Sequence, residues 1–174
     1  MGNWKWPFAA LALTMCQANA WSATALGEIN IQMYGNIVDF TCVAEGSDSD
    51  KTVTLGTWPT KQLSTTGSRT QPMPFTLKLT GCPPGSASIT FSGKTDGSDS
   101  GLLALNDAST ANNVAVEIRD ADKTRLALQQ ASQPVAVDAQ GNAELSFYAN
   151  YIATADNPRP GRADADATFM INYN

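Results

Sequence analysis

The chain of 174 residues contains no histidine, only three cysteines and only 16% charged residues. Without histidine, the Ser-His-Asp and Cys-His catalytic pairs, zinc sites with imidazole ligands and the usual general base near neutral pH are excluded. The 11 lysines and arginines against 16 aspartates and glutamates leave no basic excess for a phosphate backbone, so nucleic acid is not a predicted partner. With 43% hydrophobic residues, the chain is long enough to bury a core without a metal or a cofactor.

The N-terminus is typical of a secretory signal peptide. A short apolar stretch follows a single positive charge, and the small residues Ala18 and Ala20 occupy the two positions that a signal peptidase reads. A membrane anchor is the alternative, but a spanning helix needs about twenty apolar residues. A lipoprotein is disfavoured because the bulky Met15 precedes the cysteine that would be lipidated. We therefore expect residues 1–20 to be the signal peptide, cleaved before Trp21, and the mature chain to be exported.

Two cysteines, Cys42 and Cys82, remain after this cleavage. An even pair of cysteines in an exported protein predicts a disulfide, because the compartments outside the cytoplasm are oxidising. A reactive thiol is disfavoured, since the sequence offers neither a histidine nor a Cys-x-x-Cys spacing that would lower a thiol pKa.

The body of the chain has the period-two alternation of β-strands, and helical periodicity is nearly absent. Turn clusters rich in Gly, Ser, Asp and Pro separate the alternating segments, which favours an antiparallel β-sandwich. An antibody-type domain is disfavoured because Thr80 stands where a tyrosine corner would need tyrosine. The predicted strands lie in Ile29–Ile37, Phe75–Leu79, Ile89–Phe91, Val114–Ile118, Leu145–Tyr151 and Ala165–Tyr173, and Val53–Leu55 is a further candidate.

Three aspartate pairs have the spacing of calcium or paired-carboxylate sites. They are Asp48/Asp50, Asp120/Asp122 and Asp164/Asp166. None continues into the Asp-x-Asp-x-Asp-Gly pattern with its closing glutamate. Because residues two apart lie on one face of a strand, we interpret Asp164 and Asp166 as a solvated outer face and the other pairs as turn residues. The sequence predicts no metal site, no cofactor and no catalytic residues.

Both ends of the mature chain are alternating segments without an obvious hairpin partner. Ala25–Val38 directly follows the predicted cleavage site, and Asp164–Asn174 alternates up to the last residue. If such a segment were an exposed edge strand, it would tend to pair with a strand of another chain. The pattern alone is also that of ordinary strands in a closed sandwich, in which Gly35 would mark a bulge.

These termini resemble those of chaperone-usher pilins, specifically the subunits of type 1 fimbriae, and the resemblance covers essentially all of residues 21–174. In that family the last strand carries alternating apolar residues, a penultimate tyrosine and a glycine fourteen positions from the end, as Phe169, Tyr173 and Gly161 do here. The family's N-terminal extension has a central glycine among alternating apolar residues, as Gly35 has here. Further segments that match in kind and order are Thr52–Gly56, Leu79–Cys82, Asn113–Ile118 and Ala163–Phe169.

The resemblance implies an all-β, incomplete immunoglobulin-like β-sandwich, the pilin fold, which lacks its seventh strand and is completed by donor-strand complementation. Residues 21–38 would be the N-terminal donor-strand extension, and residues 39–174 would be the pilin domain. The donor-strand residues expected to insert into a neighbour's groove are Ile29, Ile31, Met33, Gly35 and Ile37. The residues expected to form the groove and the chaperone-binding C-terminal strand are Gly161, Ala167, Phe169, Ile171 and Tyr173.

The same resemblance implies a structural, non-enzymatic subunit of a type 1-like adhesive fimbria, polymerised by donor-strand exchange and contributing to cell adhesion. Its partners would be a periplasmic chaperone, an outer-membrane usher and neighbouring fimbrial subunits, and its location a fimbrium on the cell surface, reached through the periplasm. The turn Gly81-Cys-Pro-Pro-Gly85 looks closer to minor subunits, which favours a minor or adaptor position. The alternative is a self-contained secreted carbohydrate-binding β-sandwich or adhesin module. Family adhesins carry a separate lectin domain and lack the donor extension, which disfavours it here.

Overall fold

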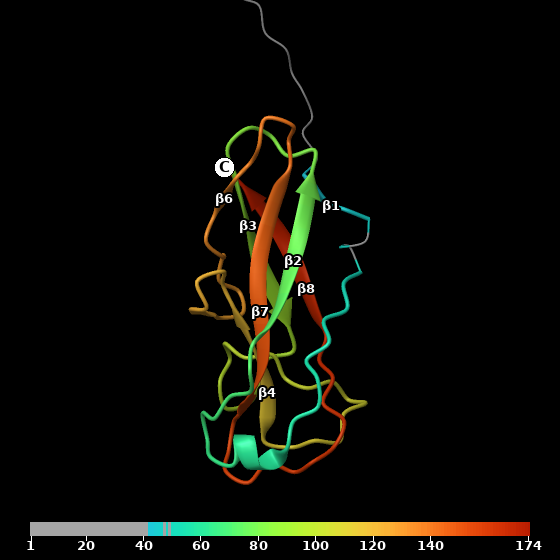
Figure 1. Cartoon of the computed structure of the whole chain (residues 1–174), viewed down its shortest axis with the longest axis vertical. Helices are drawn as coiled ribbons and strands as arrows, with labels where there is room; N and C mark the ends of the chain where they lie inside the picture. The colour runs from blue at the N-terminus through green and yellow to red at the C-terminus, as the bar shows by residue number, and fades with distance from the viewer. Residues whose placement is uncertain (1–41, 47, 49) are drawn as a thin grey trace, which may run out of the picture. The chain divides into compact units, whose positions relative to one another are not determined.

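Alternation of apolar and polar residues folds the chain into two antiparallel sheets (Figure 1). The computed structural model describes residues 42–46, 48 and 50–174. One sheet has the strand order β1 (Val43–Ala44), β2 (Met73–Thr80), β7 (Ala143–Ala153), β4 (Val114–Arg119) and β5 (Arg125–Leu126). The other has the order β6 (Val135–Ala136), β3 (Ser86–Gly93) and β8 (Ala167–Tyr173). A short 3-10 helix, η1 (Thr60–Leu63), precedes β2.

Most of the strands predicted from alternation are present. The predicted strand at Ala165–Tyr173 begins two residues later, at Ala167. The predicted strand at Val53–Leu55 is wrong, because the structure assigns no strand there. Its side chains do alternate between half-buried and exposed, but the segment has no neighbouring strand with which to pair. Ile29–Ile37 lies outside the described residues. The confirmed predictions are Phe75–Leu79, Ile89–Phe91, Val114–Ile118 and Leu145–Tyr151.

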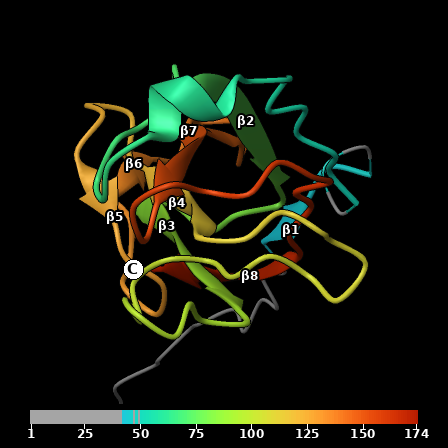
Figure 2. The same ribbon diagram turned by 90° about the horizontal axis from the view of Figure 1, so that it is seen from below.

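The core lies between the two sheets, which Figure 2 shows from below. Phe147 of β7 is 1% exposed, and its ring centroid lies 5.1 Å from that of Phe91 on β3, edge to face. Phe75 of β2 lies 5.5 Å from Phe147 on the same side. Aromatic pairs in this arrangement contribute about 0.5–1.5 kcal/mol beyond the burial of their area. These phenylalanines fix how the two sheets face each other, and the prediction of an all-β sandwich is confirmed.

The predicted disulfide is present between Cys42 and Cys82. Cys82 follows β2 and is 3% exposed, within the core cluster. The bond therefore ties Cys42, the first described residue, to the end of β2. The chain-entropy treatment of a loop of this length gives about 4 kcal/mol of stabilisation.

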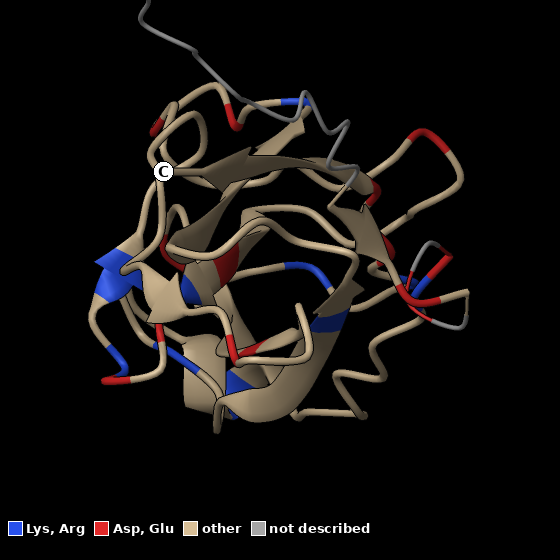
Figure 3. Ribbon diagram, turned by 90° about the horizontal axis from the view of Figure 1, so that it is seen from above, with Lys and Arg blue, Asp and Glu red and all other residues tan. Residues whose placement is uncertain are grey.

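Charged residues lie mostly in the loops, and the ribbons of β3 and β8 contain none (Figure 3). The main exception is Glu117 of β4, whose side chain is fully buried. Arg69 donates from Nε to Glu117 Oε2 over 2.9 Å, and Arg119 donates from Nη2 to the same oxygen over 2.7 Å. Asn150 of β7 adds a third donor at 3.2 Å. Burial alone would raise the pKa of Glu117, but these hydrogen bonds outweigh it and hold the pKa below its ordinary value.

We predict that Glu117→Gln lowers the free energy of unfolding by about 3 kcal/mol at pH 7, because it leaves two arginines beside a neutral amide. Since the folded-state pKa is lowered, the carboxylate stabilises the fold above its unfolded pKa of about 4.3, and this contribution is lost as the pH falls further. The difference in free energy of unfolding between wild type and variant should therefore become smaller below about pH 4. Urea denaturation across pH measures it, with Glu144→Gln, an exposed glutamate of β7, as the control. A gap that is constant with pH would contradict the assignment.

Candidate functional site: an open groove beside β8

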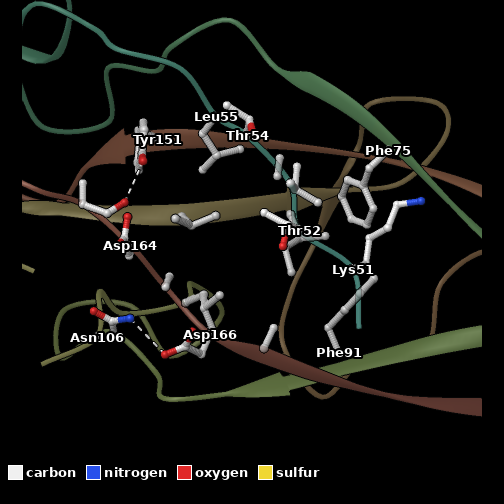
Figure 4. A pocket seen from close by; sticks show the side chains of 18 of the residues that line it. Lys51, Thr52, Thr54, Leu55, Phe75, Phe91, Asn106, Tyr151, Asp164 and Asp166 are labelled. Atoms are coloured by element: carbon white, nitrogen blue, oxygen red, sulfur yellow. Dashed lines mark hydrogen bonds between the residues drawn. The ribbon is translucent and has the colours of Figure 1, made fainter. Parts of the chain in front are cut away.

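A groove with a volume of about 1140 Å³ opens between two segments that lie far apart in the sequence (Figure 4). One wall is the chain from Asp50 to Thr57, and the other is the chain from Arg162 to Phe169, which includes the start of β8. The floor is apolar and comes from both sheets, so the groove reaches the core itself. The floor residues include Phe75, Leu77, Phe91, Val116, Ile118 and Ala149.

Strand β8 is paired on one side only. It is the last strand of its sheet and pairs with β3. Ser86 and Asn174 exchange two backbone hydrogen bonds of 2.9 Å, and in an antiparallel ladder every second residue pair does the same. The even-numbered residues of β8 are therefore bonded to β3. The odd-numbered residues direct their N–H and C=O groups to the other side, where the groove opens beside the chain up to Phe169.

Two even-numbered residues upstream of β8, Asp164 and Arg162, also have bonded backbone groups. The Asp164 carbonyl accepts a hydrogen bond from the Asn106 N–H over 2.8 Å, and the Asp164 N–H donates to the Ser109 hydroxyl over 2.8 Å. The Arg162 carbonyl accepts from the Thr110 N–H over 2.9 Å. These two residues are thus held by the chain from Asn106 to Thr110 and not by the opposite wall at residues 50–57. Five odd-numbered residues keep backbone groups that bond to nothing in the described chain: Ala165, Ala167, Phe169, Ile171 and Tyr173.

The opposite wall also has unused backbone groups. Between residues 51 and 57, no backbone N–H donates a hydrogen bond to any described residue. All four residues from Thr52 to Leu55 line the groove, and of these Val53 and Leu55 are half-buried whereas Thr52 and Thr54 are exposed. The wall is held at its start by Asp48, whose carboxylate accepts hydrogen bonds from Lys51 Nζ (2.6 Å) and the Lys78 N–H (2.8 Å). These bonds, the one from Lys51 first, lower the pKa of Asp48.

One end of the groove is occupied by Tyr151 of β7. Its hydroxyl donates to the carbonyl of Ala163 over 2.6 Å (Figure 4). Burial of the ring raises the pKa of Tyr151, and the neighbouring Asp164 adds to this, so the hydroxyl remains a proton donor at neutral pH. The carbonyl of Ala163, the next odd-numbered residue before Ala165, is therefore already in use.

The structure brings together some of the site residues predicted from the sequence. Ala167 and Phe169 line the groove. Ile171 is half-buried against the core, and Tyr173 is 51% exposed. Gly161 precedes β8, and a Cβ there would overlap the backbone of Ala111, which explains the need for glycine at that position. The predicted donor residues Ile29, Ile31, Met33, Gly35 and Ile37 lie outside the described residues.

Sequence reasoning missed the wall from Asp50 to Thr57 as part of the site, and it missed Tyr151. The alternation of Val53 and Leu55 was a usable signal for one exposed and one inward face. Tyr151 gave no such signal, since it belongs to a regular strand pattern and only the fold places its hydroxyl beside Ala163.

The groove carries few groups suited to chemistry. Asp164 is paired with Arg162, and Asp166 accepts a hydrogen bond from Asn106 Nδ2 over 3.0 Å. Across residues 42–46, 48 and 50–174, no three His, Cys, Asp or Glu side chains are grouped so that they could hold a metal ion. The same residues include no helix of the length and apolar character needed to cross a membrane. What the site does offer is unpaired backbone above an apolar floor.

Comparisons with known proteins converge on one family. A family model described as "Fimbrial protein" matches residues 31–174. The "Fimbrial-like protein FimF" of Salmonella typhimurium is 56% identical over 167 residues, which are 96% of each chain. The "Fimbrial subunit type 1" of Salmonella typhimurium is 35% identical over 153 residues, 82% of this chain and 81% of that one. The crystal structure of the P pilus rod subunit PapA has a fold that matches with a TM-score of 0.61 at 17% identity, covering 76% of this chain and 99% of PapA.

We predict that proline is tolerated at Ala167 and harmful at Thr168, two adjacent exposed residues of β8. Proline removes the backbone N–H, which is unused at Ala167 but bonded to β3 at Thr168. Thr168→Pro should therefore lower the free energy of unfolding by about 2 kcal/mol more than Ala167→Pro, as the loss of a ladder hydrogen bond requires. Urea denaturation of both variants measures this difference. Equal destabilisation would mean that the odd-numbered residues do not face open space.

Proposed function

The chain belongs to the fimbrial protein family and is a structural subunit of a chaperone-usher fimbria, and we propose that its groove receives a β-strand donated by another protein. The fold is the pilin-type, immunoglobulin-like sandwich expected from the sequence, as the likeness to PapA shows. The observation that carries the proposal is the free edge of β8 above an open apolar floor. An edge of this kind is a template for strand pairing.

A strand inserted beside β8 would find hydrogen-bonding partners on both sides. The free groups of Ala167 and Phe169 in β8, and of Ala165 just before it, face the inserted strand, and the unused N–H groups of residues 51–57 lie on the opposite wall. Its alternate side chains would reach the floor near Phe91 and Val116. Fully burying one apolar side chain contributes about 1.5–3 kcal/mol. Main-chain bonds would supply affinity, and alternate side chains in the floor would supply register.

We propose that the chain also provides such a strand to a neighbour. The segment of residues 21–38 carries Ile29, Ile31, Met33 and Ile37 on one phase of an alternating pattern, and Gly35 shares that phase. In a neighbour's groove, Gly35 would face the floor without a side chain and allow close approach. Residues 39–174 would form the domain that receives a strand, and residues 1–20 would be removed as the signal peptide.

Membership of the family implies contact with other pilus subunits. We propose further that a periplasmic chaperone fills the groove first, through the edge of β8 with Phe169, Ile171 and Tyr173, and that an outer-membrane usher exchanges it for the next subunit's strand. The subunit would then stand in a fimbrium on the cell surface after export through the periplasm. This role requires no catalysis, metal or cofactor.

We also propose that the subunit is minor, or adaptor-like, in its fimbria. The identity of 56% to the fimbrial-like protein of Salmonella typhimurium exceeds the 35% to the fimbrial subunit type 1 of that species. The turn from Gly81 to Gly85 points the same way, as in the family's minor subunits. In the structure this turn lies against the C-terminus. Gly85 is so close to the carbonyl oxygen of Asn174 that a Cβ there would collide with it.

A synthetic peptide of residues Ala25–Val38 should bind the full mature chain and raise its thermal midpoint. A ligand at a hundredfold excess over its Kd adds about 2.7 kcal/mol, which corresponds to about 5–10 °C for a domain of this size. The Gly35→Val peptide should give a shift below about 2 °C, because a branched side chain would meet the groove floor. Differential scanning calorimetry measures both. If neither peptide changes the midpoint, the groove takes no such strand and a self-contained binding module becomes the better explanation.

In fimbriae purified from cells that express the whole gene set, this chain should be present at less than about one-tenth of the copy number of the rod subunit. A minor subunit occurs at few positions of the fibre, whereas a rod subunit repeats along it. Quantitative mass spectrometry with isotope-labelled reference peptides measures the ratio. A ratio near or above one would assign the chain to the rod.

A further inference from the structure

The register of an inserted strand is not fixed by alternation alone. A slip of two residues keeps every apolar side chain on the floor side, because the side-chain period of a strand is two. Something other than the apolar pattern must therefore stop an inserted strand from sliding along β8. Among the described residues, Tyr151 is placed to do this, at the end of the groove beside Ala163.

Tyr151 blocks the next pairing position. By the alternation described above, the carbonyl of Ala163 faces the same side as the free groups of Ala165 and Ala167, and it would be the next acceptor for an inserted strand. The Tyr151 hydroxyl already donates to this carbonyl over 2.6 Å. A strand that slid one pairing position further would have to displace the hydroxyl or leave its own N–H without a partner. An unpaired buried donor is costly.

The tyrosine is itself held firmly. Its N–H donates to the Thr70 hydroxyl over 3.0 Å, and its carbonyl accepts the Thr70 N–H over 3.0 Å. Its backbone also pairs with Val116 in the β4–β7 ladder. The ring packs against both the main core and a second cluster formed by Leu63, Val114 and Ala153. A group fixed on so many sides acts as a stop and does not yield to a sliding strand.

The number of positions left open agrees with this stop. Five described residues have free backbone groups along this edge: Ala165, which precedes β8, and Ala167, Phe169, Ile171 and Tyr173 of β8. The alternating phase from Ile29 to Ile37 also has five positions. Every strand pair in the described chain is antiparallel. In that orientation, full use of the edge places Ile37 opposite Ala165 and Ile29 opposite Tyr173.

We propose that Tyr151 is a positioning residue that sets the register of the donated strand, by ending its pairing with β8 at Ala165. This rests on the proposed function of the groove. The hydroxyl matters because it occupies the carbonyl of Ala163, and removal of that one oxygen opens a sixth pairing position. The strand then populates a second register, shifted by two residues toward Ala163.

Disulfide trapping reads the register directly. In the proposed register, Thr168 stands opposite residue 34 of the donor, at a pair that is not hydrogen-bonded and has a Cα separation of about 4.5 Å, suitable for a disulfide. In the slipped register, Thr168 stands opposite residue 32. The full mature chain carrying Thr168→Cys is mixed with Ala25–Val38 peptides carrying Tyr34→Cys or Gln32→Cys, each activated as a mixed disulfide.

With Tyr151 present, the Tyr34→Cys peptide should cross-link at least tenfold more than the Gln32→Cys peptide. In the Tyr151→Phe background, the Gln32→Cys yield should rise to within about threefold of the other. Tyr148→Phe, three residues earlier on β7, is the matched control and should leave the tenfold preference unchanged. A change in stability alone would lower both yields together and would not alter their ratio.

Two failures are distinguishable because thermal shifts are recorded on the same mixtures. If the peptides raise the thermal midpoint but the cross-linking ratio is the same in the Tyr151→Phe and Tyr151 backgrounds, the role of Tyr151 is overturned and the strand-accepting groove stands. If no peptide raises the midpoint or cross-links in either background, the proposed function fails and the inference fails with it.

Discussion

The unpaired edge of strand β8 is the feature on which the rest of this structure depends. Strand β8 satisfies half of its backbone groups through β3, and the other half faces a groove that reaches the core between the sheets. Unpaired backbone next to apolar surface is unfavourable in water and favourable beside a matching strand, since pairing satisfies the polar groups and buries the apolar ones in a single step. The groove and the edge are therefore one feature, and neither would be useful without the other.

The rest of the fold keeps that edge open and rigid. The aromatic contact of Phe91 with Phe147 joins the two sheets across the core beneath the groove. On the other face of the larger sheet, Arg69 and Arg119 bind the buried carboxylate of Glu117 and tie β4 to the segment before β2. The bond between Cys42 and Cys82 ties the residue before β1 to the end of β2. Of these residues, Phe91 also lies on the groove floor, and the others do not line the groove.

Alternation in the sequence predicted the strands because each has one buried face. The prediction of a strand at β7 is confirmed, and its alternate residues Leu145, Phe147 and Ala149 are all buried. Alternation failed at Val53–Leu55 for a physical reason, because a strand is defined by pairing and this segment faces open space where a partner would lie. The roles of the termini came from resemblance to a family and not from periodicity, which fits a closed sandwich equally well. Neither periodicity nor the resemblance could predict the hydrogen bond of Tyr151, because it joins β7 to Ala163, a residue outside any strand.

A fibre built by strand donation needs two kinds of information in each groove. The apolar floor selects strands of the right alternation, but a pattern with period two fits a floor in several registers. A fixed end to the pairing edge resolves this, because it converts a sliding contact into one with a single best position. The polar contact at Ala163 is suited to that task, since a misplaced N–H is penalised abruptly whereas a misplaced methyl group is penalised gradually. Placing the stop on the receiving domain lets one groove impose its register on any donor of the family pattern.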